Sequence, residues 1–139
     1  MINAIDLAYF IITKCSRENC PISNLQLQKI LFFIQRDRLR KGDWCIKDDF
    51  EAWPYGPVIP SVYEKFCSYG SMCIDEEFAY HLNKKVIGDI NDIVEYLRNM
   101  DPWKLVDETH KKSGSWNFVY NDGSGYKKLI PKNVIKDRG

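Results

Sequence analysis

A long helix over residues 22–42 is the feature that most constrains how this chain can fold. Ser23 and Gln26 form an S-x-x-Q capping box, in which each side chain satisfies a backbone N–H group at the start of the helix. Gly42 follows the last residue of the pattern and supplies the stop. The apolar positions recur at helical spacing and predict one face turned to the core: Leu27, Ile30, Leu31 and Ile34.

The rest of the chain predicts a mainly α (α+β) fold, a compact bundle of about five to six helices with short extended segments or a small hairpin. A length of 139 residues indicates one domain over residues 1–139. Extended segments are expected over 44–53, and a loop or hairpin at Asn121-Asp122-Gly123. The other helices are predicted from the Asn3 cap to Cys15, from Pro60 to Gly70, over Ile90 to Leu97, from Asp101-Pro102 to Gly114, and from about Pro131.

Composition narrows the functions that the chain can serve. Hydrophobic residues make up 45% and charged residues 28%, which is typical of globular proteins. Twenty Lys and Arg against 19 Asp and Glu give a net charge of +1, so no overall field attracts DNA or a membrane. The first apolar run ends after about ten residues, where a membrane span needs about twenty. We therefore expect a cytoplasmic protein that binds no membrane.

Five cysteines and two histidines raise the question of metal or nucleophilic chemistry. The cysteine spacings repeat no C-x-x-C pattern, and free thiols are favoured over a zinc site with His81 and His110. A cysteine-dependent enzyme would need a thiol of lowered pKa beside a base, which nothing in the sequence indicates. No phosphate-binding or hydrolase motif occurs either. We expect no enzyme, no metal and no cofactor.

Basic residues gather where the long helix ends, at Arg36, Arg38, Arg40 and Lys41. Two helices joined by a short linker can imitate a helix-turn-helix, so these residues are candidates for nucleic-acid contact. A recognition helix, however, presents its N-terminal part to the bases, and cations also complement the negative end of a helix without any ligand. The favoured interpretation is a solvated helix end.

The segment FEAWPYGPVIP, residues 50–60, is unusually rigid and aromatic. Its three prolines fix their own φ and push the residue before each of them toward extended geometry. Trp53 and Tyr55 are therefore held on a stiff turn, where they can dock into the core or contact a partner, and docking is favoured. Gly56 allows the turn a conformation that other residues resist.

Two residues late in the chain are expected to act together. His110, on the predicted fifth helix, is expected to be a hydrogen-bonded structural residue. Trp116 is expected to form a lid on the core, and the two are predicted to do one job.

Three spaced motifs resemble the SocA-like, Panacea-domain antitoxins, a family that includes GepA-like phage-associated proteins. They are LQLQKILFFIQ (25–35), FEAWPYGPVIPSVYEKF (50–66) and ETHKKSGSW (108–116). Ser115 departs from the proline that the family often has before its late Trp. The residues that match family motifs, and are candidates for partner binding, are Gln28, Lys29, Trp53, Tyr55, Gly56, Pro57, Val58, Tyr63, Thr109, His110 and Trp116.

The resemblance implies a non-enzymatic protein that binds and neutralises a toxin encoded by the adjacent gene. Neutralisation would be direct, or the protein would act as an adaptor that delivers the toxin to a ClpXP-type protease. A phage counter-defence protein that binds a host immunity factor, and a DNA-binding transcriptional repressor, are the alternatives. No residue of the chain names the toxin.

Overall fold

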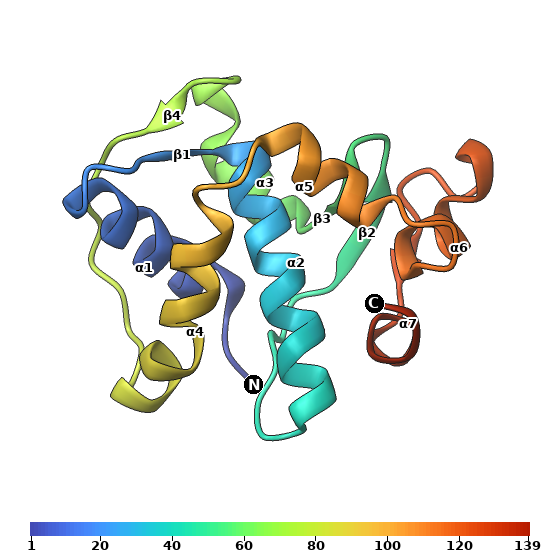
Figure 1. Cartoon of the computed structure of the whole chain (residues 1–139), viewed down its shortest axis with the longest axis horizontal. Helices are drawn as coiled ribbons and strands as arrows, with labels where there is room; N and C mark the ends of the chain where they lie inside the picture. The colour runs from blue at the N-terminus through green and yellow to red at the C-terminus, as the bar shows by residue number, and fades with distance from the viewer.

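The computed structural model describes residues 1–139 and is mainly helical, which confirms the predicted fold class (Figure 1). The helices are α1 (Ala4–Arg17), α2 (Asn24–Lys41), α3 (Pro60–Phe66), α4 (Lys84–Leu97), α5 (Pro102–Thr109), α6 (Ser115–Tyr120) and α7 (Lys132–Arg138). The strands are β1 (Ile22–Ser23), β2 (Phe50–Trp53), β3 (Gly56–Val58), β4 (Cys73–Ile74) and β5 (Leu129–Ile130).

Helix α2 is the central element and packs against α1, α3, α4, α5 and α7, whereas α6 packs on α7, β2 and β5 at the edge of the molecule (Figure 1). The predicted capping box is confirmed, because Ser23 Oγ accepts a hydrogen bond from the backbone N–H of Gln26 while Gln26 Oε1 accepts one from that of Ser23. Gly42 ends the helix with a φ of +79°, as predicted. Twelve of the 18 residues of α2 are buried, so the helix is covered on more sides than a single apolar face implies.

The rigid segment 50–60 forms a hairpin. Strands β2 and β3 pair antiparallel, with Trp53 opposite Gly56, so that only Pro54 and Tyr55 make the turn. Strand β5 pairs with the other edge of β2, with Phe50 opposite Ile130. The three-stranded sheet therefore joins the middle of the chain to its C-terminal segment.

The structure corrects the prediction between residues 109 and 123. Helix α5 ends at Thr109, not at Gly114, and α6 follows as a separate helix, which raises the number of helices to seven from the predicted five to six. The Asn117 side chain donates to the carbonyl oxygens of His110 and Lys111, which satisfies the end of α5 from within α6. Residues Asn121–Gly123 form a 3₁₀ turn and no hairpin, so the loop alternative is correct.

One hydrophobic cluster of 29 buried residues joins α1, α2 and α4 to the sheet. None of the helices combines the length and apolar character required to cross a membrane. All five cysteines are free thiols, and no group of three or more His, Cys, Asp or Glu side chains is placed to hold a metal ion. Several polar side chains of α2, among them Lys29, Gln28 and Gln35, are also buried.

Candidate functional site

Lys29 is the most unusual side chain of the core. It projects from α2, its exposed fraction is 0%, and its Nζ donates one hydrogen bond to the carbonyl oxygen of Pro57 at 3.3 Å. No carboxylate lies within ion-pair distance of this ammonium group. Because burial disfavours the charged form, it lowers the pKa of Lys29 from 10.5 to about 7. Lys29 thus ties the central helix to the hairpin as an amine that is partly neutral at physiological pH.

Gly56 makes this approach of Lys29 to the hairpin backbone possible. Its φ is +116°, and a Cβ atom at this position would lie 2.8 Å from Thr109 Oγ1 and 2.9 Å from Lys29 Nζ. Both the backbone conformation and the lack of space require glycine. The prediction that Gly56 allows the turn an unusual conformation is confirmed. Gly56 also brings Lys29 and Thr109, from two of the three sequence motifs, into one place.

His110 and Trp116, which were predicted to act together, form a stack beside this point. Their ring centroids are 3.7 Å apart and their planes differ by 2°, and Tyr120 extends the stack. Trp116 is buried, as the lid interpretation predicts, and its Nε1 donates to the carbonyl oxygen of Trp53 at 2.7 Å. The motif around residues 108–116 is thereby fastened to the hairpin.

The surroundings of His110 favour the neutral imidazole. Burial and the nearby charge of Lys29 lower the pKa of His110, while Asp107 and the backbone of Tyr55 oppose them. His110 Nε2 is buried and has no hydrogen-bond partner, so the predicted role of a hydrogen-bonded residue is not met at this nitrogen. The ring serves instead as one face of the aromatic stack.

Polar side chains of α2 also hold the chain on either side of the hairpin. Gln28 accepts a hydrogen bond from the backbone N–H of Ile59 at 2.9 Å and donates to Asn24 at 3.1 Å. Gln35 accepts from the N–H of Ile46 at 2.7 Å and donates to its carbonyl at 3.0 Å. Sequence reasoning missed Gln35, although a glutamine on a helix this apolar was a signal. Among the motif residues, Pro57 and Val58 are buried with this group.

Two aromatic pairs lie on the outer side of the hairpin, and we call them the hairpin aromatics. The first is Trp53 against Tyr63, with ring centroids 5.0 Å apart. The second is Tyr55 against Trp103 at 5.7 Å, with 60% and 58% of these residues exposed. Figure 1 shows the hairpin tip rising between α5 and α6. The predicted docking into the core is met by neither ring: Trp53 is half-buried but lies outside the core cluster, and Tyr55 points outward.

Sequence reasoning did not identify Trp103 as part of this surface. Trp103 is the second residue of α5. Its backbone N–H donates a hydrogen bond to the Asp101 side chain, which fixes the start of that helix. Lys127 Nζ lies 5.2 Å from the centroid of the Trp53 ring, so a cation borders the first pair. The hairpin aromatics therefore combine rigid rings with a positive charge.

The basic cluster at the end of α2 is not gathered on one exposed face. Arg38 is buried, with ion pairs to Asp37, Asp43 and Asp89 at 3.0 to 3.3 Å. Arg40 donates to the carbonyl oxygen of Lys136. The two remaining members have different neighbours: the Arg36 guanidinium lies over the Phe33 ring, and Lys41 forms an ion pair with Asp37. Nucleic-acid contact stays a prediction for this cluster, and Arg38 already has its partners inside the protein.

The cysteines show no activated nucleophile in the buried core. Burial raises the pKa of the Cys15 thiol, which keeps it in the protonated form that reacts poorly.

Comparison with known proteins gives two matches. The profile described as "Antitoxin SocA-like, Panacea domain" matches residues 27–117, a range that holds all eleven motif residues predicted from the sequence. The chain is similar to Antitoxin SocA of Caulobacter vibrioides (strain NA1000 / CB15N), with 30% identity over 99% of this chain and 82% of that protein. No solved structure matches. The similarity thus covers the buried cluster and the hairpin aromatics together.

Proposed function

Because the chain belongs to the SocA-like, Panacea-domain antitoxin family, we propose that it binds a toxin protein encoded by the adjacent gene and neutralises it through the hairpin aromatics. The observation that carries this proposal is the exposed pair of Tyr55 and Trp103 on a hairpin fixed from below. Aromatic rings held in place lose little conformational entropy on binding, and such residues dominate the energetics of protein interfaces.

The buried residues support this role as a scaffold. Lys29, Gln28 and Trp116 each bond to a backbone group of the segment 53–59, so three contacts fix the hairpin from its inner side. A surface that is ordered before binding pays no cost of ordering when the partner arrives. Nothing in this role requires a reaction at the site, in keeping with a non-catalytic regulator.

Binding alone or delivery to a protease are two ways in which such a complex would neutralise the toxin. Direct inhibition leaves the amount of toxin unchanged and lowers its activity. An adaptor that presents the toxin to a ClpXP-type protease shortens the lifetime of the toxin. The toxin half-life, measured after protein synthesis is stopped in cells with and without the protease, separates the two.

The test of the proposal is co-expression with the product of the adjacent gene. We expect that product to arrest growth alone, and this protein to restore growth and to co-purify with it. The double variant Tyr55→Ala/Trp103→Ala should fold but lose both effects, because truncation of central aromatic residues commonly costs more than about 2 kcal/mol of binding free energy. A neighbour that is harmless alone, or stays toxic in the presence of this protein, would disprove the antitoxin role.

A matched control is available in Phe118, another aromatic residue that is 54% exposed. The guanidinium of Arg138, on α7, lies over its ring at 4.1 Å from the centroid. Phe118→Ala should leave growth rescue unchanged. Equal loss in Phe118→Ala and in the double variant would show that the hairpin aromatics are not the binding surface, even if the antitoxin role stands.

A further inference from the structure

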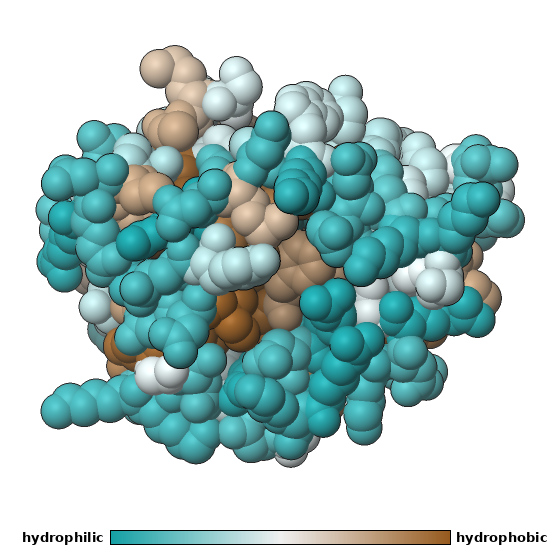
Figure 2. Space-filling model, viewed as in Figure 1, coloured by the Kyte–Doolittle hydropathy of each residue, from teal (hydrophilic) through white to brown (hydrophobic).

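A groove between α2, α4 and α5 lies on the face of the molecule shown in Figure 2, where brown and tan atoms mark a hollow near its middle. Its volume is about 390 Å³, within the range of roughly 300 to 1,000 Å³ that is usual for ligand sites. Phe33, Leu97, Met100 and Leu105 form its apolar floor. None of the features used in the proposed function lies in it.

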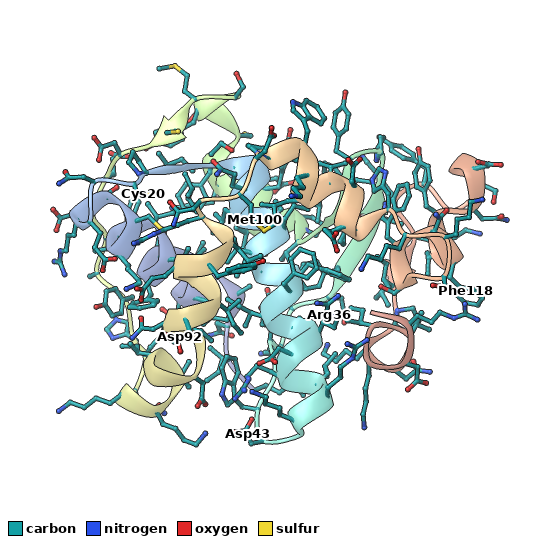
Figure 3. All side chains as sticks on the ribbon, in the orientation of Figure 1. Cys20, Arg36, Asp43, Asp92, Met100 and Phe118 are labelled. Carbon is teal, nitrogen blue, oxygen red and sulfur yellow. The ribbon has the colours of Figure 1, made fainter.

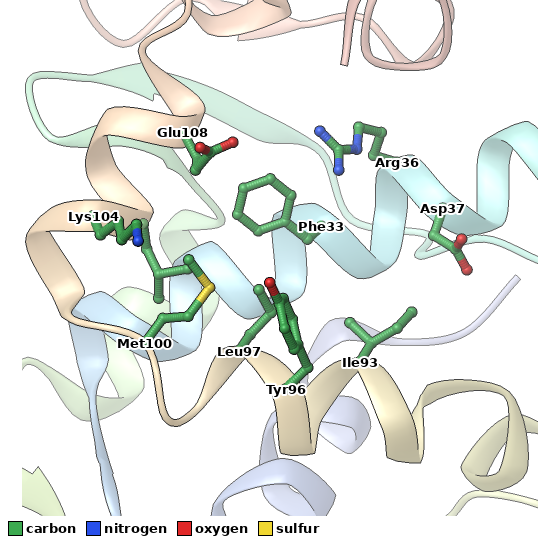
Figure 4. Close-up of a pocket in the computed structure, with 10 residues that line it drawn as sticks. Phe33, Arg36, Asp37, Ile93, Tyr96, Leu97, Met100, Lys104 and Glu108 are labelled. Atoms are coloured by element: carbon green, nitrogen blue, oxygen red, sulfur yellow. The ribbon is translucent and has the colours of Figure 1, made fainter.

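At the rim of this groove the negative charges have ion-pair partners and the positive charges do not. Figure 4 shows Arg36 and Lys104 on opposite sides of Phe33. Neither cation has an ion pair, whereas both carboxylates of the rim are engaged: Asp37 with Arg38 at 3.0 Å, and Glu108 with Lys111 at 3.0 Å. The groove therefore presents an apolar floor between two positive charges that have no ion pair, with the engaged carboxylates of Asp37 and Glu108 beside Arg36.

Arg36 is the more constrained of the two cations. It is partly buried, and its guanidinium lies 4.7 Å from the centroid of the Phe33 ring. Burial and the nearby Arg40 lower the pKa of Arg36, although an arginine keeps its charge regardless. A carboxylate that reached Arg36 would gain a charge-assisted hydrogen bond in partly desolvated surroundings.

We propose that the groove binds a short peptide segment of a partner protein in which large apolar side chains are flanked by acidic ones. The apolar side chains would fill the floor over Phe33 and Met100, and the flanking carboxylates would reach Arg36 and Lys104. Apolar anchors in a groove with charged flanks are a recurrent mode of peptide recognition. This site does not depend on the toxin proposal, because the hairpin aromatics lie outside the groove.

The test uses a fluorescein-labelled peptide in which leucines one helical turn apart are flanked by glutamates. Fluorescence anisotropy with the purified full chain should show saturable binding. Peptides with lysines in place of the glutamates, or serines in place of the leucines, should not bind. Equal binding of the lysine peptide would overturn the charge argument, and absence of binding by the glutamate peptide would overturn the proposal.

The variants locate the site. Arg36→Gln should weaken binding by at least about tenfold, the lower end of what a hydrogen bond to a charged group contributes. Lys104→Gln should weaken it by no more than about fivefold, because an exposed charge pair contributes less. Lys65→Gln, which alters an exposed lysine of α3, should bind like the unaltered protein. Unchanged affinity in Arg36→Gln, with the thermal unfolding midpoint preserved, would place the peptide elsewhere.

A separate signal does not depend on any substitution. The chain has three methionines, and only Met100 lies in the groove. In a sample labelled with ¹³C at the methionine methyl groups, peptide binding should shift the Met100 resonance and leave the exposed Met72 unchanged. Binding without a shift at Met100 would contradict the assignment to this groove.

Discussion

The two sides of the hairpin at residues 50–58 differ sharply in burial. On the inner side, Lys29 is fully buried, and Thr109 and Trp116 are 1% and 6% exposed. On the outer side, Tyr55 and Trp103 are more than half exposed and meet mainly each other. Figure 3 shows all side chains on the ribbon, and many of those at the edge of the molecule project away from it.

This difference separates what identifies the family from what can contact a partner. Most of the motif residues belong to the inner side, where they fix the path of the hairpin and the start of α6. Only a few of them, chiefly Tyr55 and Tyr63, reach the surface. Similarity in the motifs therefore speaks for a shared scaffold, and our proposal assigns the choice of partner to the outer residues.

The largest loss of folding stability is expected for Trp116→Ala, a change on the inner side of the hairpin. This change removes the stack on His110 and Tyr120 and the hydrogen bond to Trp53, and should lower the free energy of unfolding by about 3–5 kcal/mol. Urea denaturation followed by circular dichroism measures it. Trp116→Phe, which keeps a stacked ring, should lose less. A stable Trp116→Ala protein would refute the scaffold role of the inner side.

The next largest loss of stability is expected for Gly56→Ala, which should lower the free energy of unfolding by about 3 kcal/mol in the same assay. Its new methyl group must displace Thr109 or Lys29, and its φ of +116° is strained for any side chain. Gly88→Ala is the matched control, because Gly88 lies in α4 with no atom within 4 Å of the added methyl group. That control should raise stability by about 0.5–1 kcal/mol. Equal effects at the two glycines would rule out close approach as the reason for Gly56.

Much of the helical scaffold was predictable because its signals are local. The capping box of Ser23 and Gln26, the stop at Gly42 and the proline at the start of α3 act through neighbouring residues, and each appears where predicted. The break between α5 and α6 was not predictable in this way. It depends on the Asn117 side chain, which returns to the carbonyl oxygens of His110 and Lys111, and on Trp116 reaching the hairpin.

The candidate site was predictable as a set of residues but not as an arrangement. The motifs named Lys29, Gly56 and Thr109 separately, yet their meeting depends on how α2, the hairpin and α5 pack. Sequence alone also gave no reason to place Trp103 against Tyr55, since the two are far apart along the chain. Tertiary packing decides which motif residues face inward.

Lys29→Met tests whether the buried Lys29 on the inner side makes the folding stability depend on pH. The unfolded chain keeps the Lys29 proton up to a pKa of 10.5, whereas the folded protein releases it near 7, so stability should rise with pH between these values. One proton gives a slope of at most about 1.4 kcal/mol per pH unit. Lys29→Met should lose this contribution, while Lys104→Met, at an exposed lysine, should retain it. Urea denaturation at pH 7, 8 and 9 compares the three proteins. An identical slope in all three would mean that Lys29 keeps its charge in the core.

The smallest effect on stability is expected for Trp103→Ala, although it removes the same kind of side chain as Trp116→Ala. Trp103 is 58% exposed, and its aromatic contact is the edge-to-face pair with Tyr55, which contributes about 0.5–1.5 kcal/mol in addition to the area it buries. Alanine also favours the helix slightly more than tryptophan does, so the net loss in urea denaturation should stay well below that of Trp116→Ala. A loss as large as that of Trp116→Ala would show that Trp103 is part of the scaffold. A small loss would leave Trp103 free to be judged by binding alone, because any failure of Tyr55→Ala/Trp103→Ala to neutralise the toxin could then not be ascribed to unfolding through this residue.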